Sequence, residues 1–181
     1  PVYPADPGSK KQFSLVYLGI MGPQDNVDLV LDVMEHLVHK RGREDVRATL
    51  LGFGDCLEDL RYRCTELDLD DCVTFTGRAD RTMIADHLSI ADVGLCPDLK
   101  TPLNDVSTMN KTMEYMAYAL PSVSFDLLET QVGRADGFIL AAADEVGRDR
   151  AGEWEATDRL VHVLRHVVAE HHAIDAAAAR G

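Results

Sequence analysis

The stretch PLNDVSTMNKTMEYMAYALP, from Pro102 to Pro121, joins a polar loop to a helix that we expect from about Asn110 to Ala119. Lys111 falls in the first turn of this helix, and Glu114 follows one residue short of a turn later. The start of a helix offers free backbone N–H groups and the positive end of its dipole, which together favour a phosphate. A carboxylate just inside the helix can accept hydrogen bonds from both hydroxyls of a ribose. The stretch therefore predicts a nucleotide site.

Outward from this stretch, compact β-type runs alternate with apolar residues at helical spacing. Alternation with short connections is typical of a parallel sheet with helices on both faces. The sequence therefore predicts the α/β fold class, with a doubly wound, Rossmann-like parallel sheet of about six strands. Such sheets bind ligands at the carboxyl ends of their strands. We expect strands at 13–18, 46–51, 72–76, 92–96, 122–125 and 138–141, and helices at about 27–38, 57–64, 80–88 and 110–119.

Polar residues ahead of the helices predict how these helices start. Asp25 or Asn26 can cap the helix that carries Val27 to Val38, and Asp80 can cap the third helix. Asp55 and Glu58 have the spacing of a capping box at the start of the second helix.

Charge and composition exclude several classes of protein. The 181 residues carry a formal net charge of −13, which argues against broad binding of nucleic acid because its phosphates would be repelled. No apolar run approaches the ~18 residues that span a bilayer, and no signal peptide opens the chain. We expect a reducing, cytoplasmic setting, since the cysteines lack the paired spacing of a metal site. These are Cys56, Cys64, Cys72 and Cys96.

The block from Ser107 to Glu114 holds the best candidate ligands for an anion. Ser107, Thr108 and Asn110 are N-cap candidates that can also donate hydrogen bonds, and Lys111 adds a positive charge. The alternative is a helix cap beside a solvated lysine and a surface glutamate. We favour the functional interpretation, because a preceding loop of a dozen residues in a compact domain usually has a function.

Two further turns follow predicted strands. Gly19 and Gly22 flank the turn after the first strand, where glycines let the backbone approach a ligand closely. Gly77 and Arg78 follow the third strand, where backbone groups could meet a base and the guanidinium could stack on a ring.

We expect no metal and no cofactor. The run Asp68-Leu-Asp-Asp71 is interpreted as a solvated turn rather than a cation site. His162 and His166 lie four apart without the His-Glu-x-x-His pattern of a zinc enzyme.

Five motifs in this order resemble those of one enzyme family. They are LGIMG (18–22), LLGFGD (50–55), VTFTGR (73–78), ADVGLCP (91–97) and NKTMEYMAYALP (110–121). From about Gln12 to Ala141 the chain resembles the C-terminal, donor-binding domain of a family 4 glycosyltransferase, one half of the two-domain GT-B fold. Residues 1–11, which begin with a proline-rich stretch and no Met, then look like a linker from a missing N-terminal domain. Residues 12–181 would be the nucleotide-sugar domain, with 142–181 a divergent C-terminal helical segment.

The resemblance implies a role for each motif. Glu114 would bind the ribose, and residues 108–111 would receive the diphosphate. Gly77 and Arg78 would meet the base, while the turn from Gly19 to Gly22 would lie against the phosphates or the sugar. The implied reaction is transfer of a sugar from a nucleoside diphosphate sugar, with retention of configuration at the anomeric carbon. A UDP-sugar is the favoured donor. Lys111 and the amides at the helix start would stabilise the leaving diphosphate without a metal.

The sequence also departs from the family at three positions. The usual Glu-x7-Glu pair would need a carboxylate where Val106 stands, so we take the adjacent Asp105 as the candidate for the sugar hydroxyls. The Arg and Lys that commonly follow the first strand correspond to Ile20 and Asp25. Lys111 could replace these missing cations, which makes Lys111 and Asp105 the candidate catalytic residues.

Two other functions stay open. One is a degenerate module retained for protein contacts, which the residues at positions 20, 25 and 106 favour. The other is a sugar-nucleotide epimerase of the same fold, which would need His or carboxylate pairs in the sugar site. On the glycosyltransferase interpretation, the partners are a nucleotide-sugar donor and the missing acceptor-binding domain, through which the protein would reach the inner face of the membrane. The chain alone would then bind donor without useful transfer.

Overall fold

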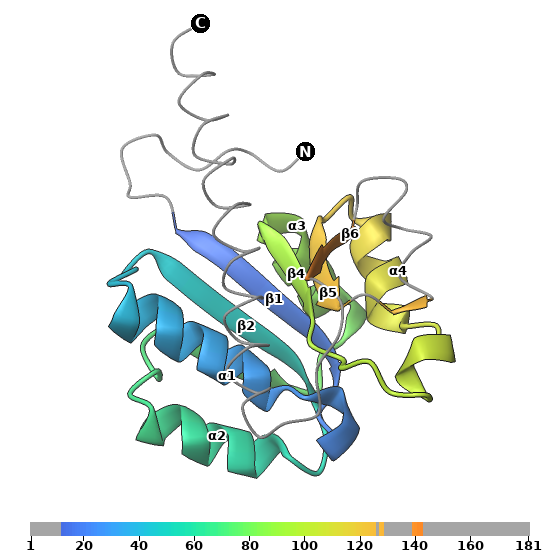
Figure 1. Ribbon diagram of the computed structural model, residues 1–181. Helices are drawn as coiled ribbons and strands as arrows, with labels where there is room; N and C mark the ends of the chain where they lie inside the picture. The colour runs from blue at the N-terminus through green and yellow to red at the C-terminus, as the bar shows by residue number, and fades with distance from the viewer. Residues whose placement is uncertain (1–11, 126, 129–138, 143–181) are drawn as a thin grey trace, which may run out of the picture.

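Six parallel strands form a single sheet in the computed structural model, which describes residues 12–125, 127–128 and 139–142. Their spatial order is β3-β2-β1-β4-β5-β6, with the reversal of strand order between β1 and β4 (Figure 1). The predicted Rossmann-like parallel sheet of six strands is therefore confirmed. The strands are β1 (Phe13–Ile20), β2 (Val46–Phe53), β3 (Val73–Gly77), β4 (Val93–Cys96), β5 (Ser122–Phe125) and β6 (Ile139–Ala142).

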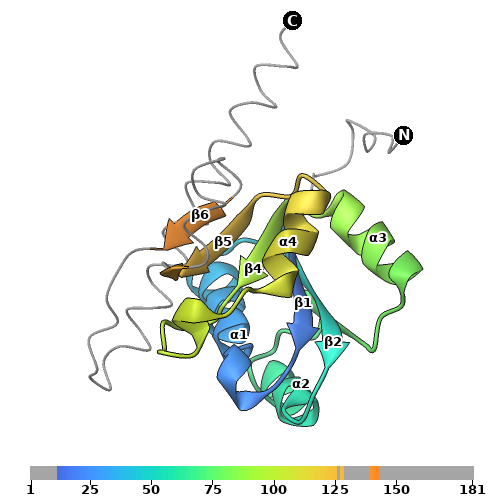
Figure 2. The ribbon, with the colours of Figure 1, turned by 90° about the vertical axis from the view of Figure 1, so that its right-hand side faces the viewer.

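Helices cover both faces of the sheet. The first and second lie on one face and the third and fourth on the other (Figure 2). None of the helices in the described residues is long and apolar enough to cross a bilayer. The four helices are α1 (Asp28–Glu35), which runs on into one π-type turn, η2 (His36–Lys40), then α2 (Leu57–Glu66), α3 (Arg81–Ile90) and α4 (Asn110–Ala117).

Strand β1 is buried on both faces, as the centre of a doubly wound sheet must be. Leu15 and Tyr17 belong to the larger apolar cluster beneath α1 and α2, whereas Val16 and Leu18 belong to the smaller cluster beneath α3 and α4. The two-residue alternation of a strand thus divides one apolar run between the two cores.

Strands β1 and β4 separate soon after they meet, because they pair only at Leu15 with Val93 and Val16 with Gly94. The side chain of Tyr115, from α4, occupies the crevice beyond. Its hydroxyl accepts a hydrogen bond from the N–H of Leu18 at 2.9 Å and donates to the carbonyl of Leu95 at 3.2 Å. Burial raises the pKa of Tyr115 well above its usual value, so the hydroxyl keeps its proton.

Of the caps predicted for the first three helices, one forms and two do not. Asp80 does cap α3, accepting the N–H of Met83 at 2.9 Å. In contrast, Asp25 accepts the N–H of Gly22 at 3.0 Å, because a short 3-10 helix, η1 (Pro23–Asp25), precedes α1. Asn26 adopts a left-handed conformation between the two helices, and no side chain caps α1.

The capping box predicted for α2 does not form either. The helix begins after Cys56 without a side-chain cap. Glu58 instead forms an ion pair with Arg61 on the exposed side of the helix, at 2.9 Å.

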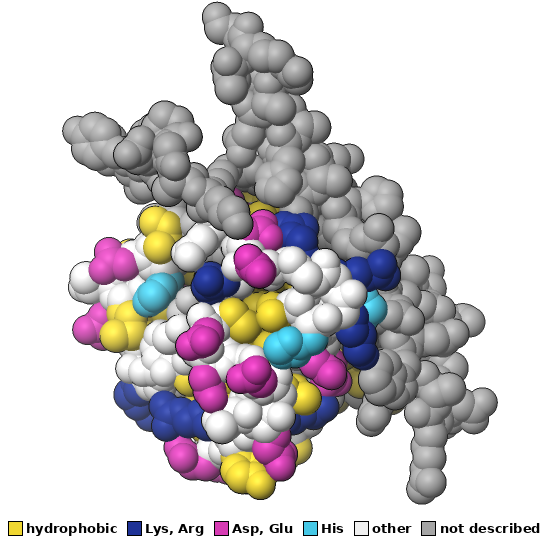
Figure 3. All heavy atoms as spheres, turned by 90° about the vertical axis from the view of Figure 1, so that its left-hand side faces the viewer, with side chains coloured by type: hydrophobic (Ala, Val, Ile, Leu, Met, Phe, Trp, Pro, Cys, Tyr) yellow, Lys and Arg dark blue, Asp and Glu magenta, His cyan; other side chains and the backbone are white. Residues whose placement is uncertain are grey.

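On the face shown in Figure 3, acidic side chains are interspersed with basic ones and with scattered apolar ones. This face therefore offers no continuous basic surface.

Tyr115→Phe should lower the free energy of unfolding by about 1–3 kcal/mol, because the N–H of Leu18 and the carbonyl of Leu95 lose a buried partner. Urea unfolding followed by circular dichroism measures this loss. Tyr118→Phe is the matched control, because Tyr118 is exposed at the end of the same helix. This substitution should change the free energy of unfolding by no more than about 0.5 kcal/mol. Equal losses in the two variants would contradict a bridging role for the Tyr115 hydroxyl.

Candidate functional site

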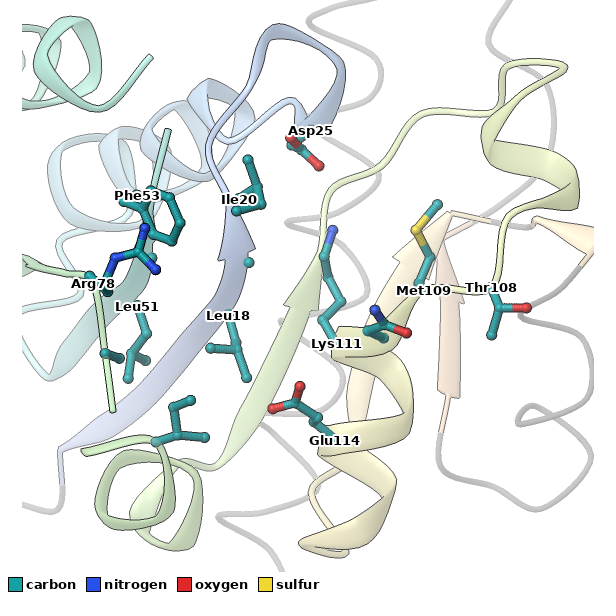
Figure 4. Close-up of a pocket in the computed structure, with 15 residues that line it drawn as sticks. Leu18, Ile20, Asp25, Leu51, Phe53, Arg78, Thr108, Met109, Lys111 and Glu114 are labelled. Carbon is teal, nitrogen blue, oxygen red and sulfur yellow. The ribbon is translucent and has the colours of Figure 1, made fainter. Parts of the chain in front are cut away.

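A cleft of about 430 Å³ opens at the carboxyl ends of β1 and β2 and reaches the first turn of α4 (Figure 4). This is the edge where a doubly wound sheet binds its ligands, next to the reversal of strand order. Among the described residues, its lining is formed by Leu18, Gly19, Ile20, Asp25, Leu51, Gly52, Phe53, Arg78, Ala79, Ile84, Thr108, Met109, Asn110, Lys111 and Glu114.

Helix α4 starts at the cleft without a side-chain cap. Its N-cap residue is Met109, so the prediction that Ser107, Thr108 or Asn110 occupies that position is wrong. The hydroxyl of Ser107 is engaged elsewhere, donating to the carbonyl of Leu103 at 2.6 Å. The first N–H groups of a helix have no acceptor within it, and here no N-cap side chain supplies one.

Lys111 is buried and paired. Its ammonium donates to both carboxylate oxygens of Asp98, at 2.7 and 2.8 Å, and it lies 5.2 Å from the centre of the Tyr17 ring. Only 8% of Lys111 and 2% of Asp98 are exposed. The solvated lysine considered as an alternative is therefore wrong.

Glu114 lies one residue short of a turn beyond Lys111, so the two side chains leave α4 on neighbouring lines. Its carboxylate is exposed and lines the cleft. In Figure 4 Lys111 extends to the ends of the strands, whereas Glu114 points from α4 toward the side on which Leu18 lies. A ligand that touches the start of α4 can therefore reach a carboxylate and an ammonium together.

The opposite wall of the cleft is apolar with one cation. The guanidinium of Arg78 stacks on the ring of Phe53, 3.7 Å from its centre (Figure 4). Phe53 is 37% exposed and Ile20 is 49% exposed, although both are large and apolar. Flat, exposed surfaces of this kind suit a ring that stacks.

The two glycines predicted to flank one site are separated. Gly19 lines the cleft, where a Cβ atom would come 2.9 Å from the hydroxyl oxygen of Tyr17 and 3.3 Å from Cε of Lys111. Glycine at this position thus makes room for two side chains of the protein itself. Gly22 lines a second hollow of about 280 Å³ instead, between the start of α1 and that of α2.

Asp105 lies outside the cleft. It belongs to a 3-10 helix, η3 (Asn104–Val106), where its carboxylate accepts the N–H of Leu128 at 2.8 Å and lies 3.7 Å from the ammonium of Lys100. The cleft brings together six of the residues predicted from the sequence and leaves out four. Those that line it are Gly19, Arg78, Thr108, Asn110, Lys111 and Glu114. Those that do not are Gly22, Gly77, Ser107 and Asp105.

Sequence reasoning missed Asp98 and Phe53. Asp98 follows β4 by two residues, so a carboxylate at the carboxyl end of a strand was the signal for it. Phe53 stands between two glycines at the end of β2, and a large apolar residue in such a turn was the signal there. Within the described residues no group of His, Cys, Asp or Glu side chains could hold a metal ion. His162 and His166 lie outside those residues.

Residues 12–148 match the family described as Glycosyl transferases group 1. The chain belongs to this family. It is also 35% identical, over 77 residues, to the amylovoran biosynthesis glycosyltransferase AmsK of Erwinia amylovora. That match covers 42% of this chain and 19% of AmsK, so the similar region is about a fifth of the length of this curated relative.

Solved glycosyltransferases share the fold of this family member. The pneumococcal O-GlcNAc transferase GtfA, in complex with UDP and GlcNAc, superposes with a TM-score of 0.65 at 15% identity, over 87% of this chain and 30% of GtfA. The C-terminal domain of LpcC, a glycosyl transferase group 1 protein of Francisella tularensis, gives 0.57 at 14% identity, over 86% of each chain. The chain thus has the fold of one GT-B domain, the C-terminal one.

The cysteines should differ sharply in reactivity. Burial raises the pKa of Cys96, at the end of β4, to about 12. Partial burial and the nearby carboxylate of Asp59 also raise the pKa of Cys56, but its side chain is only half-buried and so is accessible to a reagent. Because the thiolate is the nucleophile, iodoacetamide at roughly pH 8 should label Cys56 first and leave Cys96 unmodified in the folded chain. Peptide mass spectrometry gives the order of labelling, and all four free cysteines should react once the chain is unfolded in urea. Labelling of Cys96 as fast as Cys56 would show that the region between β4 and α4 opens readily.

Proposed function

We propose that this chain is the donor-binding domain of a retaining glycosyltransferase that takes its sugar from a nucleoside diphosphate sugar, before others a UDP-sugar. The observation that carries the proposal is the juxtaposition in one cleft of the start of α4, the carboxylate of Glu114 and the Arg78–Phe53 wall. A nucleotide sugar needs an anion site, a ribose acceptor and an apolar surface, and the cleft supplies one of each.

The diphosphate is assigned to the start of α4. Its uncapped N–H groups and dipole favour an anion, and the Lys111 ammonium adds a positive charge beside them. The formal net charge of −13 makes this local arrangement necessary, because the average surface repels phosphate.

The ribose and the base extend away from that point. Glu114 is a partner for the two ribose hydroxyls, since an exposed carboxylate accepts hydrogen bonds from both. The base is assigned to the wall of Arg78 and Phe53, where stacking is available. Uracil is preferred among the bases because UDP is bound to GtfA, a protein of the same fold.

In the reaction, the bond between the sugar and the diphosphate breaks and negative charge develops on the leaving phosphate. Groups that are already oriented toward this charge stabilise the transition state more than the bound donor. Lys111 and the N–H groups of α4 are those groups. The acceptor is assigned to an N-terminal domain outside this chain.

Calorimetric titration of the 181-residue chain with UDP, GDP and ADP tests the proposal. We expect saturable binding of UDP and weaker or no binding of the other two. Binding of GDP or ADP above UDP would change the assigned donor. Absence of binding by all three nucleotides would favour the alternative of a degenerate module that serves protein contacts. The lack of cations at Ile20 and Asp25 supports that alternative.

Glu114→Ala should weaken UDP binding by about 1–3 kcal/mol, because the ribose hydroxyls lose a charged acceptor. The unaltered chain should also prefer UDP to 2′-deoxy-UDP, and the variant should lose that preference. Calorimetry with both nucleotides measures each effect. Glu58→Ala, an exposed glutamate on α2 away from the cleft, is the control and should leave both affinities unchanged. An unaltered preference for UDP in Glu114→Ala would overturn the ribose assignment.

A further inference from the structure

We propose that Asp98 is a positioning residue for donor binding, which acts by holding the ammonium of Lys111 so that one N–H faces the diphosphate. The proposal rests on the function proposed above and adds to it a residue outside the cleft lining. Asp98 follows the end of β4, and Lys111 lies across from it in the first turn of α4.

The contact between the two side chains is double. The ammonium donates to Oδ1 at 2.7 Å and to Oδ2 at 2.8 Å, so the carboxylate holds it through both oxygens. The ring of Tyr17 lies on another side of the ammonium, 5.2 Å away at its centre, and Gly19 packs against Cε. The end of the lysine side chain is therefore held by groups of the protein itself.

Burial makes this arrangement costly unless both partners are present. Asp98 is 2% exposed and Lys111 is 8% exposed, and a charge removed from water to that extent needs its counter-charge. A lysine at the surface would instead sample many rotamers and would lose that freedom on binding a phosphate. Here the freedom is already lost in the unbound protein, which is how preorganisation raises affinity.

One donor of the ammonium is left for a ligand. An ammonium has three N–H donors, and the carboxylate of Asp98 engages at most two of them, so at least one remains. No further hydrogen bond joins Lys111 to the described part of the chain. In Figure 4 the side chain of Lys111 extends toward the end of β1, on the side where Asp25 also lies. The remaining N–H is thus available at the end of the cleft assigned to the diphosphate.

The alternative role for Asp98 is to neutralise Lys111. Asp25 and Glu114 also line this cleft, so its two cations, Lys111 and Arg78, are already matched by two carboxylates. If neutralisation were the main effect, loss of the Asp98 charge would free the ammonium and tighten phosphate binding. The two roles therefore predict opposite signs for one substitution.

The experiment compares UDP with UMP on the 181-residue chain and on Asp98→Asn, Lys111→Met and the double variant. Asp98→Asn should lower the affinity for UDP roughly 10- to 100-fold, the usual range for a lost charge-assisted hydrogen bond, and that for UMP less than about three-fold. Lys111→Met should do the same. In the Lys111→Met background, Asp98→Asn should have no further effect, because Asp98 acts through Lys111.

Asp32→Asn is the matched control. Asp32 pairs with Arg63 between α1 and α2, on the face of the sheet away from α4. Loss of the Asp32 charge should therefore leave the affinities for UDP and UMP unchanged.

Asp98→Glu is the second variant, used if Asp98→Asn does not fold. It keeps the charge but displaces the ammonium. It should weaken UDP binding and spare UMP.

Three results would overturn the inference while leaving the proposed function intact. They are unchanged or tighter UDP binding in a folded Asp98→Asn chain, an equal loss of UDP and UMP affinity, and an additional loss in the Lys111→Met background. If Asp98→Asn does not fold, unchanged UDP affinity in a folded Asp98→Glu chain would also overturn the inference. If the unaltered chain binds neither nucleotide, the proposed function and this inference fail together.

Discussion

The crevice between β1 and β4 sets the position of the groups that α4 contributes to the cleft. Beyond their two paired positions the strands diverge, and Tyr115 fills the space with its hydroxyl bonded to both. Gly94 leaves room for its ring, because a Cβ there would lie 2.6 Å from it. Once Tyr115 is fixed, the rotation of α4 about its axis is fixed too. Lys111, four residues earlier, then faces inward, and Glu114 lies beside it at the rim.

The cleft is short of free charge. Within the described lining its cations are Lys111 and Arg78, and each already has a partner in the protein, a carboxylate for one and an aromatic ring for the other. A phosphate bound here would rely on the N–H groups of α4 and on directed donors more than on net charge. Such binding depends on geometry, since a hydrogen bond weakens steeply as its angle is lost.

The periodic features of the chain could be predicted from the sequence, and the features that depend on distant partners could not. Apolar alternation gave the strands and their order along the chain because it reflects burial on two faces. The cap of α3 was found because Asp80 has a local partner, but Asp25 had two possible partners and took the N–H of Gly22. The pairing of Lys111 with Asp98 joins residues 13 apart across the crevice, and no local pattern specifies it.

The family's usual pattern, as the resemblance implies, places its cations in the loop after β1, where Ile20 and Asp25 stand here. In this chain the cation stands instead on a helix, held by a buried carboxylate. Replacing a buried ion pair with apolar residues is often neutral or stabilising, so the pair is a poor device for stability alone. A domain kept only as a scaffold for protein contacts has no physical need for it. A domain that must present one N–H at a fixed point to a leaving phosphate has that need, and for this reason the Asp98–Lys111 pair favours the enzymatic interpretation over the degenerate module.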